Sequence, residues 1–420
     1  MTAKVPLAPS VEARLEEIGS VEVLVGIPSF NNARTIGHVV RAAVAGLAKH
    51  FPNARSIIVN SDGGSKDGTP EVVAGSEFPS PATILVSYPL SPVHKIVTPY
   101  NGIPGKGSAF RTIFAIAERL QAKACVVVDS DLRSITPEWI ELLAGPVLKE
   151  DFDFVAPLYL RHKYDGTITN SIVYPLTRAL YGKDVRQPIG GDFGFSGRLA
   201  SHYLTKPVWD TNVARFGIDI WMTSTALADG FRVCESFLGA KIHDAKDPGA
   251  DLAAMFVQVV SSVFDLMSSY QERWASINAA EDVPLFGFPH GVGLEPVSVN
   301  VERMRRIFRQ GSRDLREIWE KALAAETLAE VMAVADSDEQ PFRFPDPLWV
   351  RVVYDFAAAY HRRSLPGDQL LASMVPLYLG RTASFVLQTA ESGPEDVETS
   401  VKGLGDEFLR QKAYLLQRWG

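Results

Sequence analysis

The chain has 420 residues, and its 42 Lys and Arg against 49 Asp and Glu leave a formal net charge of −7. That balance argues against a nucleic-acid-binding surface, which is usually basic. An apolar content of 46% excludes a disordered or fibrous chain. Two cysteines, Cys125 and Cys234, are too few for a disulfide framework or a cysteine metal cage.

The first twenty residues lack the basic-then-apolar order of a signal peptide. No apolar run approaches the roughly 20 residues that span a bilayer. Residues 252–267 come nearest, and polar residues interrupt them. We therefore expect a soluble cytoplasmic protein.

The first half of the sequence alternates strand-like and helix-like segments. Strand patterns occupy residues 21–27, 56–60, 83–87 and 124–128. Apolar residues recur at helical spacing in 36–47, 110–120 and 137–148, and residues 88–107 read as a loop. This alternation predicts an α/β fold with a Rossmann-like, mostly parallel central sheet covered by helices on both faces.

The second half is mixed at first and then all-helical. Strand patterns at 152–160 and 231–242 are interspersed with helical ones at 170–181, 218–228 and 249–274. After a glycine-rich linker at 286–293, helical stripes occupy 301–325, 348–360, 370–388 and 407–419. We expect an α/β domain at 1–290, divided into halves at about 20–150 and 151–290, and a helical domain at 291–420. Trp319, Trp349 and Trp419 read as core or interface residues of that helical domain.

The strongest local signal is Asp129-Ser130-Asp131, which follows the wholly apolar strand pattern at 124–128. Open α/β sheets bind ligands at the carboxyl ends of their strands. Two carboxylates one residue apart can hold a hard divalent cation that also contacts phosphate oxygens. Solvated turn residues are the structural alternative for this pattern.

A second signal is Gly105-Lys106-Gly107, directly before a predicted helix. Glycines let backbone approach a ligand closely, and a helix start offers free N–H groups to an anion. A Walker A loop is excluded, because position 100 is Tyr and position 107 is Gly. By itself the segment fits a glycine turn with an exposed lysine better than a ligand site.

Polar groups follow other predicted strands as well. Asp62 lies in a turn-rich segment after the second strand pattern, where it can contact a ligand or simply form the turn. His243 ends the 231–242 pattern, which allows metal ligation. Residues 186–192 form a glycine-containing loop suited to close backbone approach, and Asp219 lies at a helix start.

In this order, the segments resemble nucleotide-sugar-dependent glycosyltransferases of the GT-A fold. More narrowly, they are similar to the retaining enzymes that make glycosyl-glycerates, mannosylglycerate synthase and glucosyl-phosphoglycerate synthase. The resemblance runs from about residue 21 to 267. It is carried by Gly105-Lys106-Gly107, Asp129-Ser130-Asp131, residues 186–191, Gly217-Ile218-Asp219 and Lys241-Ile242-His243.

The resemblance implies a role for each matching position. A nucleoside-diphosphate sugar, GDP- or UDP-linked, would be bound by Pro28, Asn32, Asp62, Lys106, Asp129 and Ser130. Mg²⁺ or Mn²⁺ would be held by Asp131 and His243. Ile189 and Gly190 would present backbone to the donor sugar, and Asp219 would bind hydroxyls of sugar or acceptor. The acceptor carboxylate would be surrounded by Arg161, Thr169, Met255 and Lys246.

Two positions depart from the family pattern. The family usually has an acid where this chain has Asn32, which leaves the base of the donor open. Phosphoglycerate-using members carry Gly-Arg-x-Thr at the acceptor loop, whereas this loop is Gly166-Thr167-Ile168-Thr169. Because a bidentate cation for phosphate is missing there, we predict D-glycerate as the acceptor, with 3-phosphoglycerate as the alternative.

The reaction implied is transfer of glucose or mannose with retention, giving an α-glycosyl-glycerate of the compatible-solute type, in a homodimeric enzyme. The acceptor would attack the face from which the diphosphate departs, and Asp219 would position hydroxyls without bonding to the sugar. A sugar nucleotidyltransferase is a competing interpretation, but residues 27–31 lack the Gly and Arg that it would need after the first strand. A catalytically inactive sugar-nucleotide-binding protein is a third.

Overall fold

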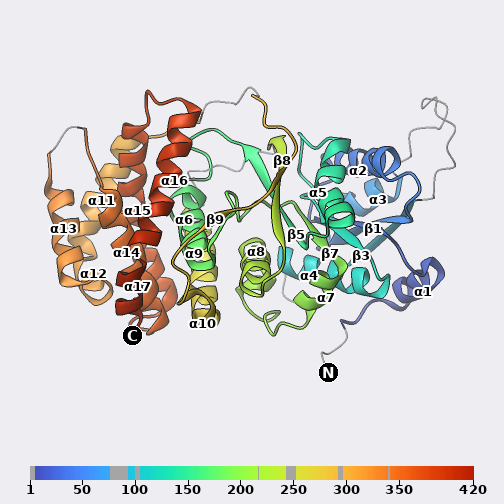
Figure 1. The fold of residues 1–420 in the computed structure, drawn as a ribbon, viewed down its shortest axis with the longest axis horizontal. Coiled ribbons are helices and arrows are strands. Elements are labelled where there is room, and N and C mark those ends of the chain that lie inside the picture. Colours follow the sequence, from blue (N-terminus) through green and yellow to red (C-terminus); the bar gives the residue numbers. More distant parts are fainter. Residues whose placement is uncertain are drawn as a thin grey trace. The chain divides into compact units, whose positions relative to one another are not determined.

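The computed structural model describes residues 5–75, 93–99, 105–215, 217–242, 252–291, 297–338 and 341–420. The chain forms two compact units (Figure 1). The sheet unit comprises Met1–Leu160, Ile189–Lys246 and Val283–Val292. The helical unit comprises Arg161–Pro188, Asp247–Asp282 and Gly293–Gly420.

An eight-stranded sheet organises the sheet unit, in the order β10-β8-β5-β7-β4-β1-β2-β3. Its strands are β1 Val23–Ser29, β2 Ser56–Asp62, β3 Val93–Pro99, β4 Ala124–Val127, β5 Phe154–Leu160, β7 Phe193–Ser196, β8 Val233–Ala240 and β10 Leu285–Phe286. Neighbours pair in parallel except β7, which runs antiparallel to both β4 and β5. The expected mostly parallel sheet is therefore confirmed.

Helices cover both faces of this sheet. They are α1 Pro9–Ile18, α2 Ile36–His50, α3 Thr69–Gly75, α4 Lys106–Arg119, α5 Pro137–Glu150, α7 Gly197–Leu204 and α8 Ile218–Ala228, with a 3₁₀ turn η3 at Asn212–Ala214. Because side chains alternate along a strand, Val25 and Ile27 of β1 join the core under α2 and α5. Gly26, between them, faces α4: a Cβ there would lie 2.6 Å from Ile113 Cγ2. The missing side chain lets α4 approach the sheet.

One strand lies where we expected a loop. β3 falls inside the predicted loop at 88–107, and that expectation is wrong because Val93, Ile96 and Val97 supply the β-branched residues of an edge strand. The strand expected at residues 83–87 lies outside the described residues. The short antiparallel β7 and helix α7 were not foreseen.

The helical unit is built from helices and one small two-stranded ribbon. Its elements are η2 Thr169–Val173, α6 Tyr174–Tyr181, α9 Leu252–Ser269, α10 Gln271–Trp274, α11 Val301–Asp314, α12 Arg316–Ala322, α13 Ala325–Asp336, α14 Asp346–His361, α15 Gly367–Gln388, α16 Pro394–Arg410, α17 Lys412–Trp419, and strands β6 Lys183–Asp184 and β9 Glu281–Asp282. As expected, Trp319, Trp349 and Trp419 are buried in its core.

The units do not divide at the expected boundary near residue 290, because two earlier segments pack with the C-terminal helices. Every residue of α6 is buried, so the helix needs partners all round. Helix α6 packs against α16. The indole of Trp349 in α14 donates to the Ser171 carbonyl oxygen at 2.8 Å. The segment at 161–188 therefore belongs to the helical unit.

Helix α15 corrects a second expectation, that no apolar run nears the length of a membrane span. Among the described residues it is the one helix long and apolar enough, by length and composition, to cross a bilayer. Within the helical unit, however, 78% of its apolar window is buried. A helix in the core of a large protein is also apolar on all sides, so the composition of α15 agrees with its buried position.

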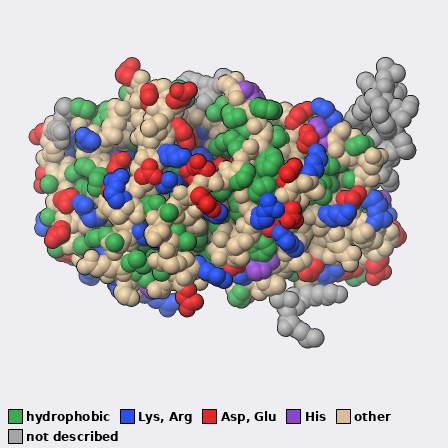
Figure 2. All heavy atoms as spheres, in the orientation of Figure 1, with side chains coloured by type: hydrophobic (Ala, Val, Ile, Leu, Met, Phe, Trp, Pro, Cys, Tyr) green, Lys and Arg blue, Asp and Glu red, His purple; other side chains and the backbone are tan. Residues whose placement is uncertain are grey.

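Charged side chains of both signs are mixed over the face that Figure 2 shows. That mixture accords with the modest net charge of −7. A local cluster of largely buried charged side chains lies in the sheet unit.

Candidate functional site

The site lies at the edge of the sheet where parallel strands end. Asp129 follows β4 and Lys241 follows β8, so both come from carboxyl ends of parallel strands. Asp192 reaches the same edge from the opposite direction, because it directly precedes the antiparallel β7. Ligands bind at this edge in open α/β sheets.

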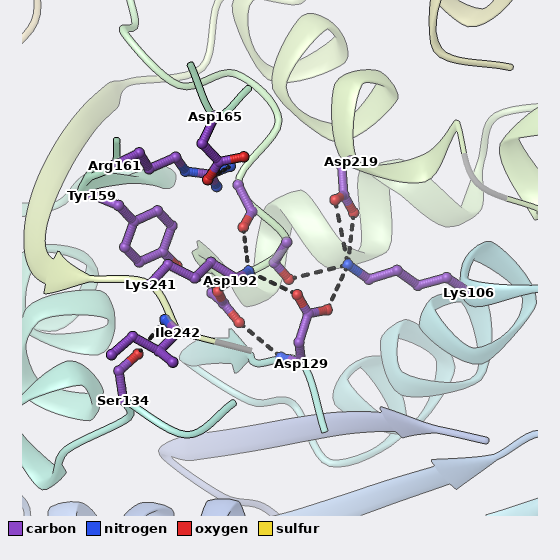
Figure 3. Close-up of polar contacts among 12 residues, drawn as sticks. Lys106, Asp129, Ser134, Tyr159, Arg161, Asp165, Asp192, Asp219, Lys241 and Ile242 are labelled. Carbon is purple, nitrogen blue, oxygen red and sulfur yellow. Dashed lines mark hydrogen bonds and ion pairs between the residues drawn. The ribbon is translucent and has the colours of Figure 1, made fainter. Parts of the chain in front are cut away.

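Two helix starts add further charged groups. Lys106 is the first residue of α4, and Asp219 lies in the first turn of α8. Lys106 Nζ lies 2.8 Å from Asp129 Oδ1 and 3.1 Å from Asp219 Oδ1 (Figure 3). It also donates to the Gly191 carbonyl oxygen at 3.3 Å. The structure thus brings together Lys106, Asp129 and Asp219, three of the residues predicted from the sequence.

Lys106 and Asp129 hold each other in their ionised forms. Burial alone would lower the pKa of Lys106, but Asp129 and Asp219 outweigh it and raise that pKa above its ordinary value. Burial alone would raise the pKa of Asp129, but Lys106 and Lys241 hold it well below its usual range. For Asp219 burial prevails, so its pKa is raised although Lys106 opposes the shift.

Two members of the cluster, Lys241 and Asp192, were not selected from the sequence. Lys241 Nζ lies 2.8 Å from Asp129 Oδ2 and 2.7 Å from Asp192 Oδ2. Burial raises the pKa of Asp192, although Lys241 opposes it. In Lys241-Ile242-His243 the histidine is the recognisable metal ligand, so the pattern does not single out the lysine. Asp192 stood at the end of the loop at 186–192 that was read for its glycines.

The glycines of Gly105-Lys106-Gly107 pack against the backbone of residues 213–215. A Cβ on Gly107 would lie 1.9 Å from the Val213 carbonyl oxygen, and one on Gly105 would lie 2.5 Å from Arg215 Cα. The Gly107 N–H donates to the Arg215 carbonyl oxygen at 3.1 Å. The expectation that these glycines open backbone to a ligand is therefore wrong for Gly107. Only the Lys106 side chain faces the site.

The loop at Ile189 and Gly190 is similarly tight. A Cβ on Gly190 would lie 2.0 Å from Pro157 Cγ. Its carbonyl oxygen accepts from Lys241 Nζ at 2.7 Å. At the next position, Gly191 has φ +85°, and a Cβ there would lie 2.3 Å from Asp129 Oδ2. Both glycines let this loop pass directly beside the buried carboxylate.

The predicted nucleotide residues lie at the ends of β1 and β2. Pro28 is buried within β1. The carboxylate of Asp62 accepts from the N–H groups of Gly64 and Ser65 and from the hydroxyls of Ser29 and Ser65. With two bonds on each oxygen, Asp62 forms the turn. Its contact with a nucleotide stays a prediction.

Asn32 connects the first loop to the aspartate turn. Its Oδ1 accepts from the Phe30 N–H at 3.0 Å and from the Ser130 hydroxyl at 2.9 Å. The Thr35 hydroxyl donates to the Ser130 carbonyl oxygen at 2.9 Å. The turn of Asp129-Ser130-Asp131 is thereby fixed against the end of β1.

Asp131 differs from Asp129 in having a carboxylate free for a ligand. It is half-buried, and no side chain or backbone group of the described residues bonds to that carboxylate. Within the described ranges no three His, Cys, Asp or Glu side chains form a group that could hold a metal ion. His243 and Lys246, predicted as metal and acceptor ligands, lie outside those ranges.

The remaining acceptor residues belong to the helical unit. Arg161 Nη1 lies 4.0 Å from Asp165 Oδ2. Thr169 begins η2, and Met255 is 49% exposed on α9. Helix α9 packs against η2 within this unit. Their grouping around an acceptor stays a prediction.

The central part of the chain is similar in sequence to a known protein family. Residues 96–265 match the family described as the mannosylglycerate synthase GT domain. Over these residues, about two fifths of its length, the chain is similar to that glycosyltransferase domain. The matched residues include the whole of the charged cluster, which consists of Lys106, Asp129, Asp192, Asp219 and Lys241.

Individual relatives are distant. A glucosyl-3-phosphoglycerate synthase from Petrotoga mobilis is 27% identical over 193 residues, which cover 43% of this chain and 55% of that protein. The chain thus spans about half the length of this curated relative. The glucosyl-3-phosphoglycerate synthase of Mycobacterium tuberculosis, solved with Mn²⁺, UDP and phosphoglyceric acid, is 22% identical at a TM-score of 0.43. That similarity covers 61% of this chain and 82% of the other.

Proposed function

We propose that this protein is a retaining hexosyltransferase that moves glucose or mannose from a nucleoside-diphosphate sugar to a glycerate-type acceptor. The observation that carries the proposal is the cluster of Lys106, Asp129 and Asp219 at the carboxyl edge of the sheet. The match to the mannosylglycerate synthase GT domain supports it. The curated relative in Petrotoga mobilis bears the name of such an enzyme.

The carboxylate of Asp131 is of the oxygen-donor type that hard divalent cations prefer. When all groups are ionised, Lys106 and Lys241 balance two of the three carboxylates of Asp129, Asp192 and Asp219. Asp131, whose carboxylate has no bonding partner among the described residues, adds a further negative charge in the same turn as Asp129. Asp131, with His243 as predicted from the sequence, would hold Mg²⁺ or Mn²⁺. The metal would stabilise negative charge on the departing diphosphate as a Lewis acid.

The chain's own residues then have distinct tasks. Lys106 Nζ, in the first turn of α4, offers a preorganised positive charge to the diphosphate. Asp219 is 14% exposed and positions hydroxyls of the sugar or the acceptor. The acceptor attacks the face from which the diphosphate departs, so no covalent glycosyl–Asp219 intermediate forms. Trapping such an adduct would contradict this assignment.

The choice of acceptor rests on Thr167. Its hydroxyl bonds to the Tyr378 hydroxyl within the helical unit, and it brings no positive charge to the acceptor loop. We therefore propose D-glycerate as the preferred acceptor. The names of the relatives favour 3-phosphoglycerate instead, and this remains the alternative. A Thr167→Arg variant is expected to shift preference toward 3-phosphoglycerate by about tenfold, since Arg pairs with phosphate in a bidentate manner.

A donor-by-acceptor screen tests the proposal. Purified protein is incubated with UDP- and GDP-linked glucose and mannose, with D-glycerate or 3-phosphoglycerate, and with Mg²⁺ or Mn²⁺. We expect metal-dependent release of nucleoside diphosphate with one donor and one of the two acceptors. Release of pyrophosphate from sugar phosphate and nucleoside triphosphate would favour a nucleotidyltransferase instead. Cytoplasmic location and a homodimer stay predictions from the sequence.

A further inference from the structure

The side chain of Lys241 joins three segments that meet at the sheet edge. Its Nζ donates to Asp129 Oδ2 at 2.8 Å, to Asp192 Oδ2 at 2.7 Å and to the Gly190 carbonyl oxygen at 2.7 Å. An ammonium group has three N–H donors, and these three contacts match that number. One buried cation therefore connects the turn after β4, the loop before β7 and the end of β8 (Figure 3).

Asp192 completes the arrangement from the other side. Its Oδ1 accepts the Asp129 N–H at 2.7 Å, and its Oδ2 accepts the Tyr159 hydroxyl as well as Lys241. Asp192 thus fixes the backbone of Asp129, while Lys241 fixes its side chain. Together they set both the position and the direction of this carboxylate.

Exposure separates these two residues from those that face a ligand. The side chain of Lys241 is 6% exposed and that of Asp192 is fully buried, whereas those of Lys106 and Asp129 are 20% and 23% exposed. Lys241 and Asp192 therefore act through Asp129 and the glycine loop and do not themselves reach a substrate.

A β-bulge accounts for the direction of Lys241. The pairing of β5 with β8 shifts by one residue after Leu158, so that Tyr159 pairs with Gly239. Side chains two residues apart share a face of the sheet, which places Lys241 on the face of Tyr159. Its Nζ lies 5.3 Å from the centre of the Tyr159 ring. Without the extra residue, Lys241 would point to the opposite face.

The next residue continues the attachment to the aspartate turn. The Ile242 N–H donates to Ser134 Oγ at 2.9 Å, and its carbonyl oxygen accepts the Arg133 N–H at 2.8 Å. The chain that leads into His243 is therefore bonded to the residues just after Asp131. Lys241 anchors the start of this connection.

We propose that Lys241, together with Asp192, is a positioning residue that holds Asp129 and the Gly190–Gly191 backbone in the geometry that binds the donor. The inference rests on the proposed function, because it concerns the same donor site. Removing the ammonium group leaves the carboxylates of Asp129 and Asp192 facing each other without a shared cation. The turn and the loop then lose the cation that joins them, and the direction of the Asp129 carboxylate is no longer fixed.

The test compares Lys241→Met and Lys241→Arg with Lys123→Met, a control at a 65% exposed lysine of the same unit. The full-length variants are assayed for kcat and for KM of donor and acceptor, and for binding of UDP and GDP with Mn²⁺ by calorimetry. Lys241→Met should lower kcat/KM for the donor by about 100-fold, within the range for residues that support metal-site ligands. The KM for the acceptor should stay within about twofold.

Two further results give the inference its specificity. Lys241→Arg keeps the charge, so its kcat/KM for the donor should be about tenfold higher than that of Lys241→Met. That recovery is expected when the charge and not packing alone is needed. Tyr159→Phe removes one bond to Asp192 without changing shape. It should lower kcat/KM for the donor by about fivefold even if Lys241→Met fails to fold.

The outcomes are distinguishable. Wild-type protein that binds no nucleoside diphosphate and transfers no sugar overturns the proposed function and the inference with it. An active wild type whose Lys241→Met and Tyr159→Phe variants keep donor kcat/KM within about twofold overturns the inference alone. An equal loss in donor and acceptor KM, with no recovery in Lys241→Arg, also overturns it.

Discussion

Both units bury lysine side chains, and the groups that face the ammonium differ. In the sheet unit, Lys106 and Lys241 each meet two carboxylates, and the pKa of Lys106 is raised. In the helical unit, Lys412 donates to the Ala179 carbonyl oxygen at 2.8 Å and lies over the Trp274 ring. Burial there lowers the pKa of Lys412 to about 7.

This difference distinguishes lysines at a ligand-binding site from a lysine in a protein core. A buried charge needs a partner of opposite charge, or it becomes neutral. The sheet unit keeps its charges at a ligand-binding edge, where Asp129 and Lys106 are still partly exposed. The helical unit encloses a lysine whose pKa burial lowers to about 7, so that it is only partly charged at physiological pH. We therefore expect the cluster around Lys106 and Asp129 to take part in the reaction, and Lys412 to affect only the stability of the fold.

The largest effect should come from Asp131→Ala. Because we assign metal binding to its carboxylate, which has no bonding partner among the described residues, turnover should fall by about 1000-fold or more while the fold is kept. Steady-state kinetics with Mn²⁺, together with circular dichroism, measure both. Asp338→Ala, at a 96% exposed acid of the helical unit, is the matched control. Wild-type turnover in Asp131→Ala would refute the metal assignment.

A comparison of Lys106→Met with Lys412→Met addresses the contrast itself. The first variant should lose about 100-fold in kcat, since it removes a preorganised charge at the diphosphate. The second should keep kcat within about twofold. Equal losses in the two variants would mean that the lysines support the fold in the same way, and the distinction between site and core would fail.

Arg161→Ala should have a smaller and more selective effect. If Arg161 holds the acceptor carboxylate, the KM for the acceptor should rise by about tenfold with little change in donor KM. Arg316→Ala, at an exposed arginine of α12, serves as control. A loss confined to the donor would assign Arg161 to another task.

The smallest effect is a pH dependence of stability. The ordinary pKa of 10.5 applies to Lys412 in the unfolded chain, against about 7 in the folded one. Between these values the unfolded chain binds a proton that the folded chain does not, so the free energy of unfolding rises with pH. The slope is at most about 1.4 kcal/mol per pH unit. Urea titrations between pH 7 and 9 should show it in the wild type.

Lys412→Met is the control for that measurement. Without the amine, the contribution of this site to the slope disappears, and the variant should be more stable than the wild type at neutral pH. Identical slopes for the two proteins would show that Lys412 is already protonated inside the fold.

The sequence predicted the sheet unit better than its site. Alternating strand and helix patterns predicted the strands β1, β2, β4, β5 and β8 along the chain, because parallel βαβ units are long and strongly periodic. The four-residue β7 and the adjacent Asp192 were not predicted. Because β7 is antiparallel to its neighbours, its amino end, and not its carboxyl end, lies at the ligand-binding edge of the sheet. Lys241 was passed over since a β-bulge, which no local pattern shows, turns it toward Asp129.

The segments that join the helical unit were equally hard to predict. The pattern at 170–181 correctly predicted a helix, now divided between η2 and α6. Which helices it packs against depends on contacts more than 170 residues away in sequence, such as that of Trp349 with Ser171. Local periodicity carries no information on such partners.

A crystal structure grown with Mn²⁺ and either UDP or GDP tests the central claim most directly. The account predicts an anomalous peak for Mn²⁺ within about 2.5 Å of a carboxylate oxygen of Asp131, with the diphosphate beside Lys106 Nζ. A diphosphate bound elsewhere on the protein, or a metal peak with no contact to Asp131, would contradict it.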